Sequence, residues 1–167
     1  ELWRKMAELG WIGLLFPRKY GGSGKRFLDL VILLEEMGRA LVPGTFVPTV
    51  VCCGLPILWA GTEEQKQEFL PRVVKGELIF TLALTEPNGR YDAQGIEVSA
   101  TPDGDDFIIN GTKLFVPYTN VADYLLCVTR AATGKSEHDG ITLFLVKADS
   151  PGISVTVLST IASDKQC

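Results

Sequence analysis

The chain has 167 residues and a formal net charge of −4, with 46% hydrophobic and 22% charged residues. This composition is typical of a globular protein and excludes a disordered chain, and the lack of basic clusters argues against nucleic-acid binding. No apolar run approaches the roughly 20 residues that cross a bilayer, so we expect no membrane span, and no signal-peptide pattern is visible.

The first half of the sequence has a helical period. Residues 1–10 place Leu2, Met6 and Leu9 on one face, which predicts a short amphipathic helix. Residues 27–41 are apolar on most faces, so we expect a largely buried helix there.

Two more helical segments precede the change of period. Residues 49–61 read as a helix that Pro56 kinks or restarts. Thr62, followed by acidic residues, is an N-cap signal for a helix that ends near Gly76.

The second half has the pattern of short β-strands. Residues 79–86 form an apolar strand, and residues 96–116 contain two strands around Asn110-Gly111, a dipeptide that favours a tight hairpin turn. Further strands are expected over residues 123–131, 140–148 and 152–158. Short strands at this spacing predict a small antiparallel β-sandwich or barrel.

The change of period predicts two domains and an α+β multidomain fold. We expect an N-terminal helical domain over residues 1–78 and a β domain over residues 79–167. The first residue is not Met and the last residues lack a helix cap or a strand partner. We therefore expect a piece of a longer protein, with the β domain truncated at its C-terminal end.

Cysteine and histidine usage indicates no metal site. Cys52 and Cys53 are adjacent, no CxxC spacing occurs, and His138 is the single histidine. We expect free, mostly buried thiols, as in a reducing compartment.

Three polar motifs invite a functional reading and a simpler one. Glu35 and Glu36 could act as a carboxylate pair, but solvent or salt-bridge contacts are the favoured interpretation. The glycine-rich residues 21–24 lack the context of a phosphate-binding loop, and a flexible connector explains them as well. His138 lies in a polar turn and is expected to be solvated.

The stretch "LALTEPNGRY", residues 82–91, ends an apolar strand in a polar unit. The Thr85 hydroxyl and nearby backbone N–H groups could bind the edge of a planar heterocycle. A turn closed by Pro87 explains the same residues, so both interpretations stay open.

Several stretches together resemble the acyl-CoA dehydrogenase family. They are "GLLFPRKYGGSG", "AGTEEQKQEFLPRVVKGEL", "LALTEP", "GDDFIINGTKLFV" and "ASDKQC", and they are spread from Gly13 to Cys167, so the resemblance extends over nearly the whole chain. The resemblance implies a helical domain and a middle β domain, with the family's C-terminal helical domain absent here. The catalytic base, expected in that absent domain, is therefore not named.

The resemblance also implies an activity. FAD accepts a hydride at its N5 atom while a carboxylate removes the α-proton of an acyl-CoA thioester, and an electron-transfer flavoprotein reoxidises the cofactor. It further implies a homo-oligomer, or a hetero-oligomer with a homologous subunit. It favours a bacterial cytoplasmic location, with the mitochondrial matrix as the alternative.

Six residues match cofactor-contacting positions of the family and are predicted to bind FAD. They are Leu82, Leu84, Thr85, Phe115, Val116 and Pro117. The first three are expected to act mostly through backbone groups, and Phe115 is expected to stack on the flavin.

Arg90, Tyr91 and Pro117 are among the residues that depart from the family pattern. Arg90 stands where a glycine is usual, and Tyr91 stands where a small serine is expected near the substrate, so Tyr91 is predicted to contact acyl-CoA. Pro117 replaces a threonine that bonds the flavin, and proline supplies neither a hydroxyl nor an N–H. These departures leave two alternatives open: a degenerate or half-site subunit that partners an active homologue, and a flavin oxidase or monooxygenase on the same fold.

Overall fold

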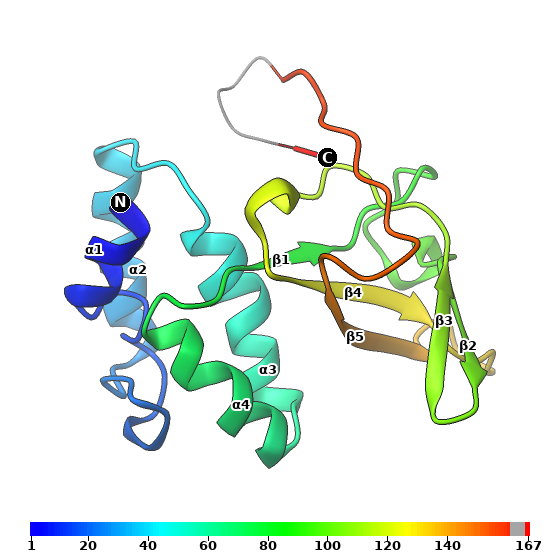
Figure 1. Ribbon diagram of the computed structural model, residues 1–167, viewed down its shortest axis with the longest axis horizontal. Helices are drawn as coiled ribbons and strands as arrows, with labels where there is room; N and C mark the ends of the chain where they lie inside the picture. Colours follow the sequence, from blue (N-terminus) through cyan, green and yellow to red (C-terminus); the bar gives the residue numbers. More distant parts are fainter. Residues whose placement is uncertain (161–165) are drawn as a thin grey trace. The chain divides into compact units, whose positions relative to one another are not determined.

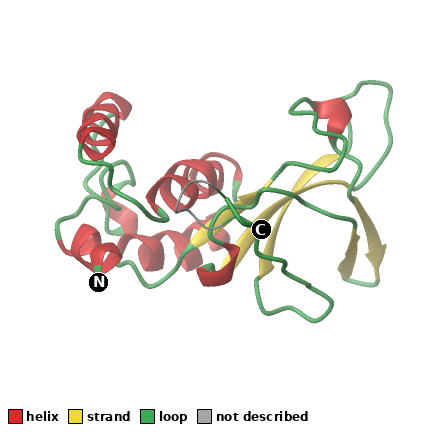
Figure 2. Cartoon of the chain, turned by 90° about the horizontal axis from the view of Figure 1, so that it is seen from above, coloured by secondary structure: helices red, strands yellow, loops and turns green. Residues whose placement is uncertain are grey.

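The computed structural model describes residues 1–160 and 166–167, so most of the "ASDKQC" motif lies outside the described residues. The described residues form two compact units, Glu1–Phe80 and Thr81–Cys167. Apart from single helical turns, the helices lie in the first unit, and the strands lie in the second, except that Phe80, the first residue of β1, ends the first unit (Figures 1 and 2). The predicted helical half followed by a β half is confirmed.

The helical unit contains four α-helices and one wider helical segment among its described residues. The helices are α1 (Leu2–Glu8), α2 (Phe27–Arg39), α3 (Leu55–Ala60) and α4 (Glu63–Val74), and a π-helical segment (Val47–Gly54) runs directly into α3. The apolar side chains that are almost fully buried in this unit include Ile12, Phe16, Tyr20, Leu30, Phe46, Val50, Leu70, Val73 and Phe80.

Local sequence signals place the ends of these helices. Pro56 is the second residue of α3, so the helix restarts there as expected. Thr62 caps α4: its hydroxyl accepts the Gln65 N–H, and the Gln65 side chain accepts the Thr62 N–H. Gly76 takes φ +71 just beyond α4, where a left-handed residue ends a helix.

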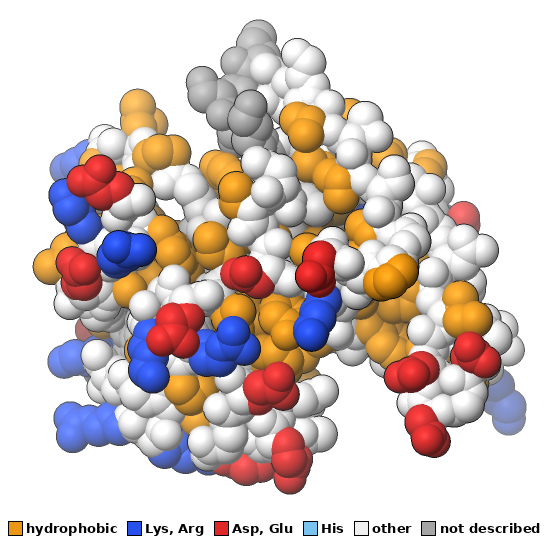
Figure 3. Space-filling model, in the orientation of Figure 1, with side chains coloured by type: hydrophobic (Ala, Val, Ile, Leu, Met, Phe, Trp, Pro, Cys, Tyr) orange, Lys and Arg blue, Asp and Glu red, His pale blue; other side chains and the backbone are white. Residues whose placement is uncertain are grey.

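The expected burial of α2 is wrong. Only Leu30 and Met37 of this helix are buried, whereas Phe27, Leu28 and Ile32 are exposed. Hydrophobic side chains are visible on the molecular surface in Figure 3. An apolar pattern on most faces shows that a helix can be buried, but contacts made by residues elsewhere decide which faces are covered.

The β unit is built on one five-stranded sheet. Its strands are β1 (Phe80–Ala83), β2 (Ser99–Asp103), β3 (Asp106–Asn110), β4 (Tyr124–Arg130) and β5 (Ile141–Lys147). The order is β1-β4-β2-β3, with β5 also on β4. The β2–β3 and β4–β5 pairs are antiparallel, and β2 touches β4 in parallel at Ser99 and Arg130.

The predicted hairpin exists, but Asn110-Gly111 is not its turn. Asp103 pairs with Asp106, so the two-residue loop starts at Gly104, which takes φ +64. A two-residue hairpin loop with a positive φ at its first position favours glycine there.

Gly111 is needed for a different reason. It follows the last residue of β3 at φ +148, and a Cβ there would come within 2.6 Å of the Val98 side chain. Gly111 therefore permits a close approach to Val98, whereas Gly104 turns the chain.

The strand expected over residues 152–158 is also wrong. The described residues there form no regular strand, and Leu158 makes one isolated bridge to Gln166. A short apolar alternation needs a neighbouring edge to pair with, which local sequence does not specify.

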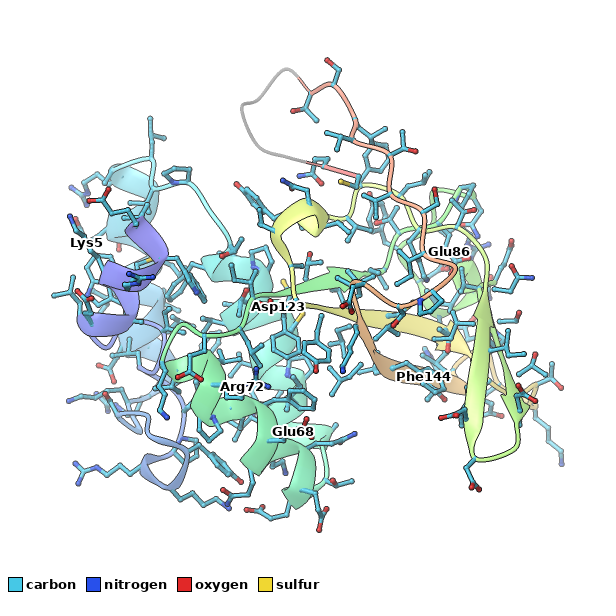
Figure 4. The ribbon with its side chains drawn as sticks, in the orientation of Figure 1. Lys5, Glu68, Arg72, Glu86, Asp123 and Phe144 are labelled. Carbon is cyan, nitrogen blue, oxygen red and sulfur yellow. The ribbon has the colours of Figure 1, made fainter. Side chains whose placement is uncertain are left out.

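The core of the β unit gathers side chains from several strands. Ala83, Val116 and Cys127 form a buried cluster, against which Ile109 and Val146 pack. In a separate contact the Phe107 ring meets the Phe144 ring at a centroid distance of 4.9 Å; Phe144 is labelled in Figure 4. Among the described residues no helix is long and apolar enough to cross a membrane.

Candidate functional site

The two segments that carry the predicted cofactor residues lie together in the β unit. The strand-end segment, residues 82–86, continues from β1, and the Lys113 segment, residues 113–117, follows β3. The Leu114 N–H donates to the Thr85 carbonyl oxygen at 2.8 Å. The structure therefore joins two stretches that lie almost 30 positions apart in the sequence.

A second contact joins β1 to the Lys113 segment. The Thr81 hydroxyl, fully buried in β1, donates to the Pro117 carbonyl oxygen at 2.6 Å. Pro117 has no N–H to offer, but its carbonyl fixes the position of the chain beside β1.

A buried ion pair between Glu86 and Lys113 stabilises the strand-end segment. The Glu86 carboxylate accepts the backbone N–H groups of Glu97 and Val98 and lies 2.6 Å from Lys113 Nζ. Lys113 Nζ also donates to the Leu84 carbonyl oxygen at 3.1 Å. Both side chains are almost fully buried, and Figure 4 labels Glu86 in the segment that follows β1. The pair satisfies charges that would otherwise be costly to bury.

Sequence reasoning missed this pair. Glu86 lies within the stretch 82–91 and Lys113 within the hairpin stretch 96–116, and the sequence pattern gives neither residue a role of its own. The available signal was a glutamate directly after an apolar strand and a lysine after a hairpin. It becomes informative only once the two segments are known to be neighbours.

Thr85 keeps its own donors free. Among the described residues no acceptor pairs with the Thr85 N–H, the Thr85 hydroxyl or the Glu86 N–H. Thr85 is half-buried, so its donors face a partly desolvated surface. Unpaired backbone donors at such a place suit a ligand that presents carbonyl or ring-nitrogen acceptors.

The remaining predicted residues differ in what they can offer. Phe115 takes φ +54 and the residue is 57% exposed, so its aromatic side chain is accessible to a ligand. Val116 is buried in the core cluster, its N–H donates to Cys167 O, and its carbonyl accepts from Cys167 N and Thr119 Oγ1. Val116 therefore packs in the core of the β unit, and both of its backbone polar groups already have hydrogen-bond partners.

Several hydrogen bonds cross-link the turn after the strand-end segment. The positive φ falls on Gly89 and not on Arg90. The Arg90 guanidinium donates to Asp92 at 2.9 and 2.7 Å and to the Gln94 side chain at 2.6 Å. Asn88 Oδ1 accepts the Arg90 N–H at 3.0 Å. The replacement of a glycine by Arg90 thus introduces no backbone strain.

The contact between Arg90 and Asp92 keeps both side chains in their charged forms. Its hydrogen bonds raise the pKa of Arg90 and lower the pKa of Asp92. Between the paired residues, Tyr91 is 75% exposed and projects from a fixed turn. A large, exposed aromatic side chain on a hydrogen-bonded turn can contact a ligand and narrow the space that the ligand occupies.

A second arginine anchors the turn to a distant loop. The Arg130 guanidinium donates to the carbonyl oxygens of Ala93 and Ile96 and, across the loop, to those of Glu137 and Asp139. Sequence reasoning did not identify Arg130. Its role requires carbonyl groups from two segments to converge on one guanidinium.

The acidic pair, His138 and the cysteines were all expected to have no role in a site, and their surroundings agree with that expectation. Arg39 pairs with Glu35 and Glu36, so these acids are salt-bridged surface residues. His138 is exposed beside Glu137. All four cysteines are free, and burial raises the pKa of Cys52 and Cys127, which makes these thiols less reactive.

The glycine-rich loop is neither a phosphate cradle nor a flexible connector. The N–H groups of residues 21–25 all donate to carbonyl oxygens of residues 13–18. A Cβ on Gly22 would come within 2.0 Å of the Phe16 carbonyl oxygen. Because its donors are used internally, the loop has none left for an anion.

Comparison with known proteins identifies both units. Residues 1–77 match the family model "Acyl-CoA dehydrogenase, N-terminal domain", and residues 81–166 match "Acyl-CoA dehydrogenase, middle domain". Acyl-CoA dehydrogenase FadE26 of Mycobacterium tuberculosis is 34% identical over 161 residues, which cover 95% of this chain. The chain spans about 40% of the length of that relative.

Solved structures agree with this similarity. An acyl-CoA dehydrogenase from Geobacillus kaustophilus superposes with a TM-score of 0.88 at 34% identity, covering 99% of this chain and 45% of that one. The ChsE4-ChsE5 complex from Mycobacterium tuberculosis gives 0.86 at 31% identity, covering 99% of this chain and 44% of that one.

Proposed function

The chain belongs to the acyl-CoA dehydrogenase family, and we propose that its full-length protein is an FAD-dependent acyl-CoA dehydrogenase. We assign residues 1–78 to its N-terminal helical domain and residues 79–167 to its middle β domain. The free donors of Thr85 and Glu86 are the observation that carries this proposal, together with the exposed Phe115, which follows the Leu114 that bonds the Thr85 carbonyl.

The residues present fit a flavin. Thr85 offers an N–H and a hydroxyl, which suit the carbonyl and nitrogen acceptors along one edge of the ring system. Phe115 offers an aromatic face, and Leu82 and Leu84 offer half-buried apolar contact. When bound, FAD supplies a two-electron acceptor for the hydrogen that leaves the acyl β-carbon as hydride.

The protein groups position this chemistry. Glu86 is held by two N–H groups and Lys113, so it is not available as a base. We propose that the base that removes the α-proton comes from outside residues 1–167. The Pro117 carbonyl accepts the Thr81 hydroxyl, which holds this part of the chain beside β1. Because proline has no donor, one hydrogen bond to the cofactor is lost, worth about 0.5–1.5 kcal/mol.

The substrate side of the site is the fixed turn. We propose that Tyr91 contacts the acyl-CoA, with the Arg90–Asp92 pair holding its backbone. An electron-transfer flavoprotein is the proposed electron acceptor, and the proposed location is the bacterial cytoplasm.

Purification of the full-length protein tests the proposal. A yellow protein whose visible absorbance bleaches on addition of an acyl-CoA, with formation of the enoyl-CoA, is the expected result. A free fatty acid of the same chain serves as the control and should cause no bleaching. A colourless protein that FAD cannot reconstitute would contradict the proposal.

A half-site subunit is the second candidate function. Pro117 lacks a cofactor donor and Tyr91 is bulky where a small residue is expected, and the similar ChsE4-ChsE5 structure is a complex of two different proteins. Co-purification with a second, related dehydrogenase would favour this candidate. Full turnover by the protein in the absence of any other chain type would exclude it.

A further inference from the structure

The buried Lys113 is aimed at one peptide group of the strand-end segment. Its ammonium donates to the Leu84 carbonyl oxygen at 3.1 Å. That carbonyl belongs to the Leu84–Thr85 peptide, which is trans. In a trans peptide the C=O and the following N–H point in opposite directions. Fixing the Leu84 carbonyl on Lys113 therefore directs the Thr85 N–H away from the ion pair.

The Thr85 N–H that results is free. Among the described residues it has no acceptor, although the Thr85 carbonyl on the other side accepts the Leu114 N–H at 2.8 Å. Both carbonyls that flank Thr85 are thus held by the Lys113 segment. The peptide cannot rotate to satisfy its N–H internally without breaking one of these bonds.

Lys113 is itself held in place. Its ammonium lies 2.6 Å from Glu86 Oε1, and Glu86 is fixed by the N–H groups of Glu97 and Val98. The chain of contacts runs from these two N–H groups through Glu86 and Lys113 to the Leu84 carbonyl. Glu86 balances the positive charge of Lys113. The main effect of Lys113 on the site is therefore to orient the Leu84–Thr85 peptide, and not to add a net charge.

From this arrangement we infer that Lys113 is a positioning residue for the cofactor. It acts through the Leu84–Thr85 peptide to present the Thr85 N–H as a preoriented donor to an acceptor on the flavin edge. The inference rests on the proposed function for the identity of the ligand. The peptide geometry itself is a property of the chain without ligand.

Lys113→Met tests this role with two readouts. In the ligand-free chain, NMR should show the Leu84 carbonyl 13C shift moving upfield as its charge-assisted hydrogen bond is lost. In the full-length protein, FAD affinity should fall at least tenfold. The binding of reduced FAD should weaken more than the binding of oxidised FAD. If the two losses of affinity differ tenfold, the two-electron reduction potential of the bound FAD falls by about 30 mV.

Matched variants separate positioning from folding. Lys113→Arg keeps a donor that can reach the carbonyl and should restore FAD affinity to within about threefold of wild type. The double variant Glu86→Gln with Lys113→Met leaves no unpaired buried charge, so it should fold, yet it should bind FAD as weakly as the single Lys113→Met variant. Lys147→Met, at an exposed lysine of the same unit, should change neither readout.

The outcomes are distinguishable. An unchanged Leu84 carbonyl shift in Lys113→Met, or equal FAD affinity in the wild-type protein and the folded double variant, overturns the inference alone. A wild-type full-length protein that takes up no FAD contradicts the proposed function and, with it, the cofactor role of Lys113.

Discussion

Lys113 Nζ lies 2.6 Å from Glu86 Oε1, and the two side chains are 9% and 3% exposed. This pair joins the end of β1 to the chain that follows β3. Removing one partner of a buried pair leaves an uncompensated charge, which typically costs 3–5 kcal/mol. The pair is therefore expected to matter for stability as well as for the site.

Lys113→Met should lower the free energy of unfolding by about 3 kcal/mol, because Glu86 keeps only its two N–H donors. Urea unfolding measures the change. Lys147→Met should stay within about 0.5 kcal/mol of wild type. A loss for Lys113→Met no larger than that of this control would contradict the role of the pair.

Thr62→Ala should destabilise the helical unit by about 1 kcal/mol, because it removes the acceptor for the Gln65 N–H at the start of α4. Thr62→Ser keeps the hydroxyl and should cost much less. Thermal unfolding of both variants checks the difference, and equal melting temperatures for the two would argue against capping.

The two glycines around β3 should respond differently to substitution. Gly104→Ala should cost about 1 kcal/mol, since the turn has open space and only the positive φ is strained. Gly111→Ala should cost more, because its Cβ would also come within 2.6 Å of the Val98 side chain. Urea unfolding measures both losses, and the reverse order would contradict the close approach of Gly111 to Val98.

The hydrogen bonds of Glu63 predict an acid-sensitive contact between α4 and the helical turn Arg18–Tyr20. Hydrogen bonds from Lys19, Gln67 and Tyr20 lower the pKa of Glu63 from its ordinary 4.5. A carboxyl whose folded pKa is depressed stabilises the fold fully above its unfolded pKa, and that stability is lost as the pH falls through the folded value.

The stability of wild type should therefore decline below about pH 4.5 more steeply than that of Glu63→Gln. Glu8→Gln, at an exposed acid on α1, is the matched control and should follow wild type. Unfolding midpoints measured between pH 7 and pH 3 check this prediction. Parallel curves for wild type and Glu63→Gln would refute it.

Tyr91→Ser should widen the range of acyl-CoA substrates and leave stability almost unchanged, because the Tyr91 side chain is 75% exposed. We expect roughly a tenfold gain in kcat/KM for a branched acyl-CoA relative to a straight one. Tyr91→Phe keeps the bulk and should retain wild-type selectivity. Identical selectivity in all three proteins would remove Tyr91 from the substrate path.

Much of the fold was predictable because its signals are local. The Thr62 cap, the restart at Pro56 and the strands that became β4 and β5 depend on residues within a few positions of one another. The resemblance of the "LALTEP" stretch to a known family also needs no knowledge of contacts.

The errors arose where local signals were ambiguous. Gly104 and Gly111 both follow polar residues that suit a turn, and the pairing of Asp103 with Asp106 decides between them. Phe27, Leu28 and Ile32 of α2 are apolar but exposed, so sequence cannot tell which apolar positions of this helix are covered. Residues 152–158 alternate like a strand but form none.

The sequence by itself determined the order of helices and strands, the family, and the two segments at the candidate site. Only the tertiary structure decided that Glu86 and Lys113, 27 positions apart, form a buried pair that fixes the Leu84 carbonyl. A helix cap or a turn depends on neighbours in the chain. Burial of a charge and the direction of a peptide depend on groups brought together by folding, and sequence distance carries no record of that proximity.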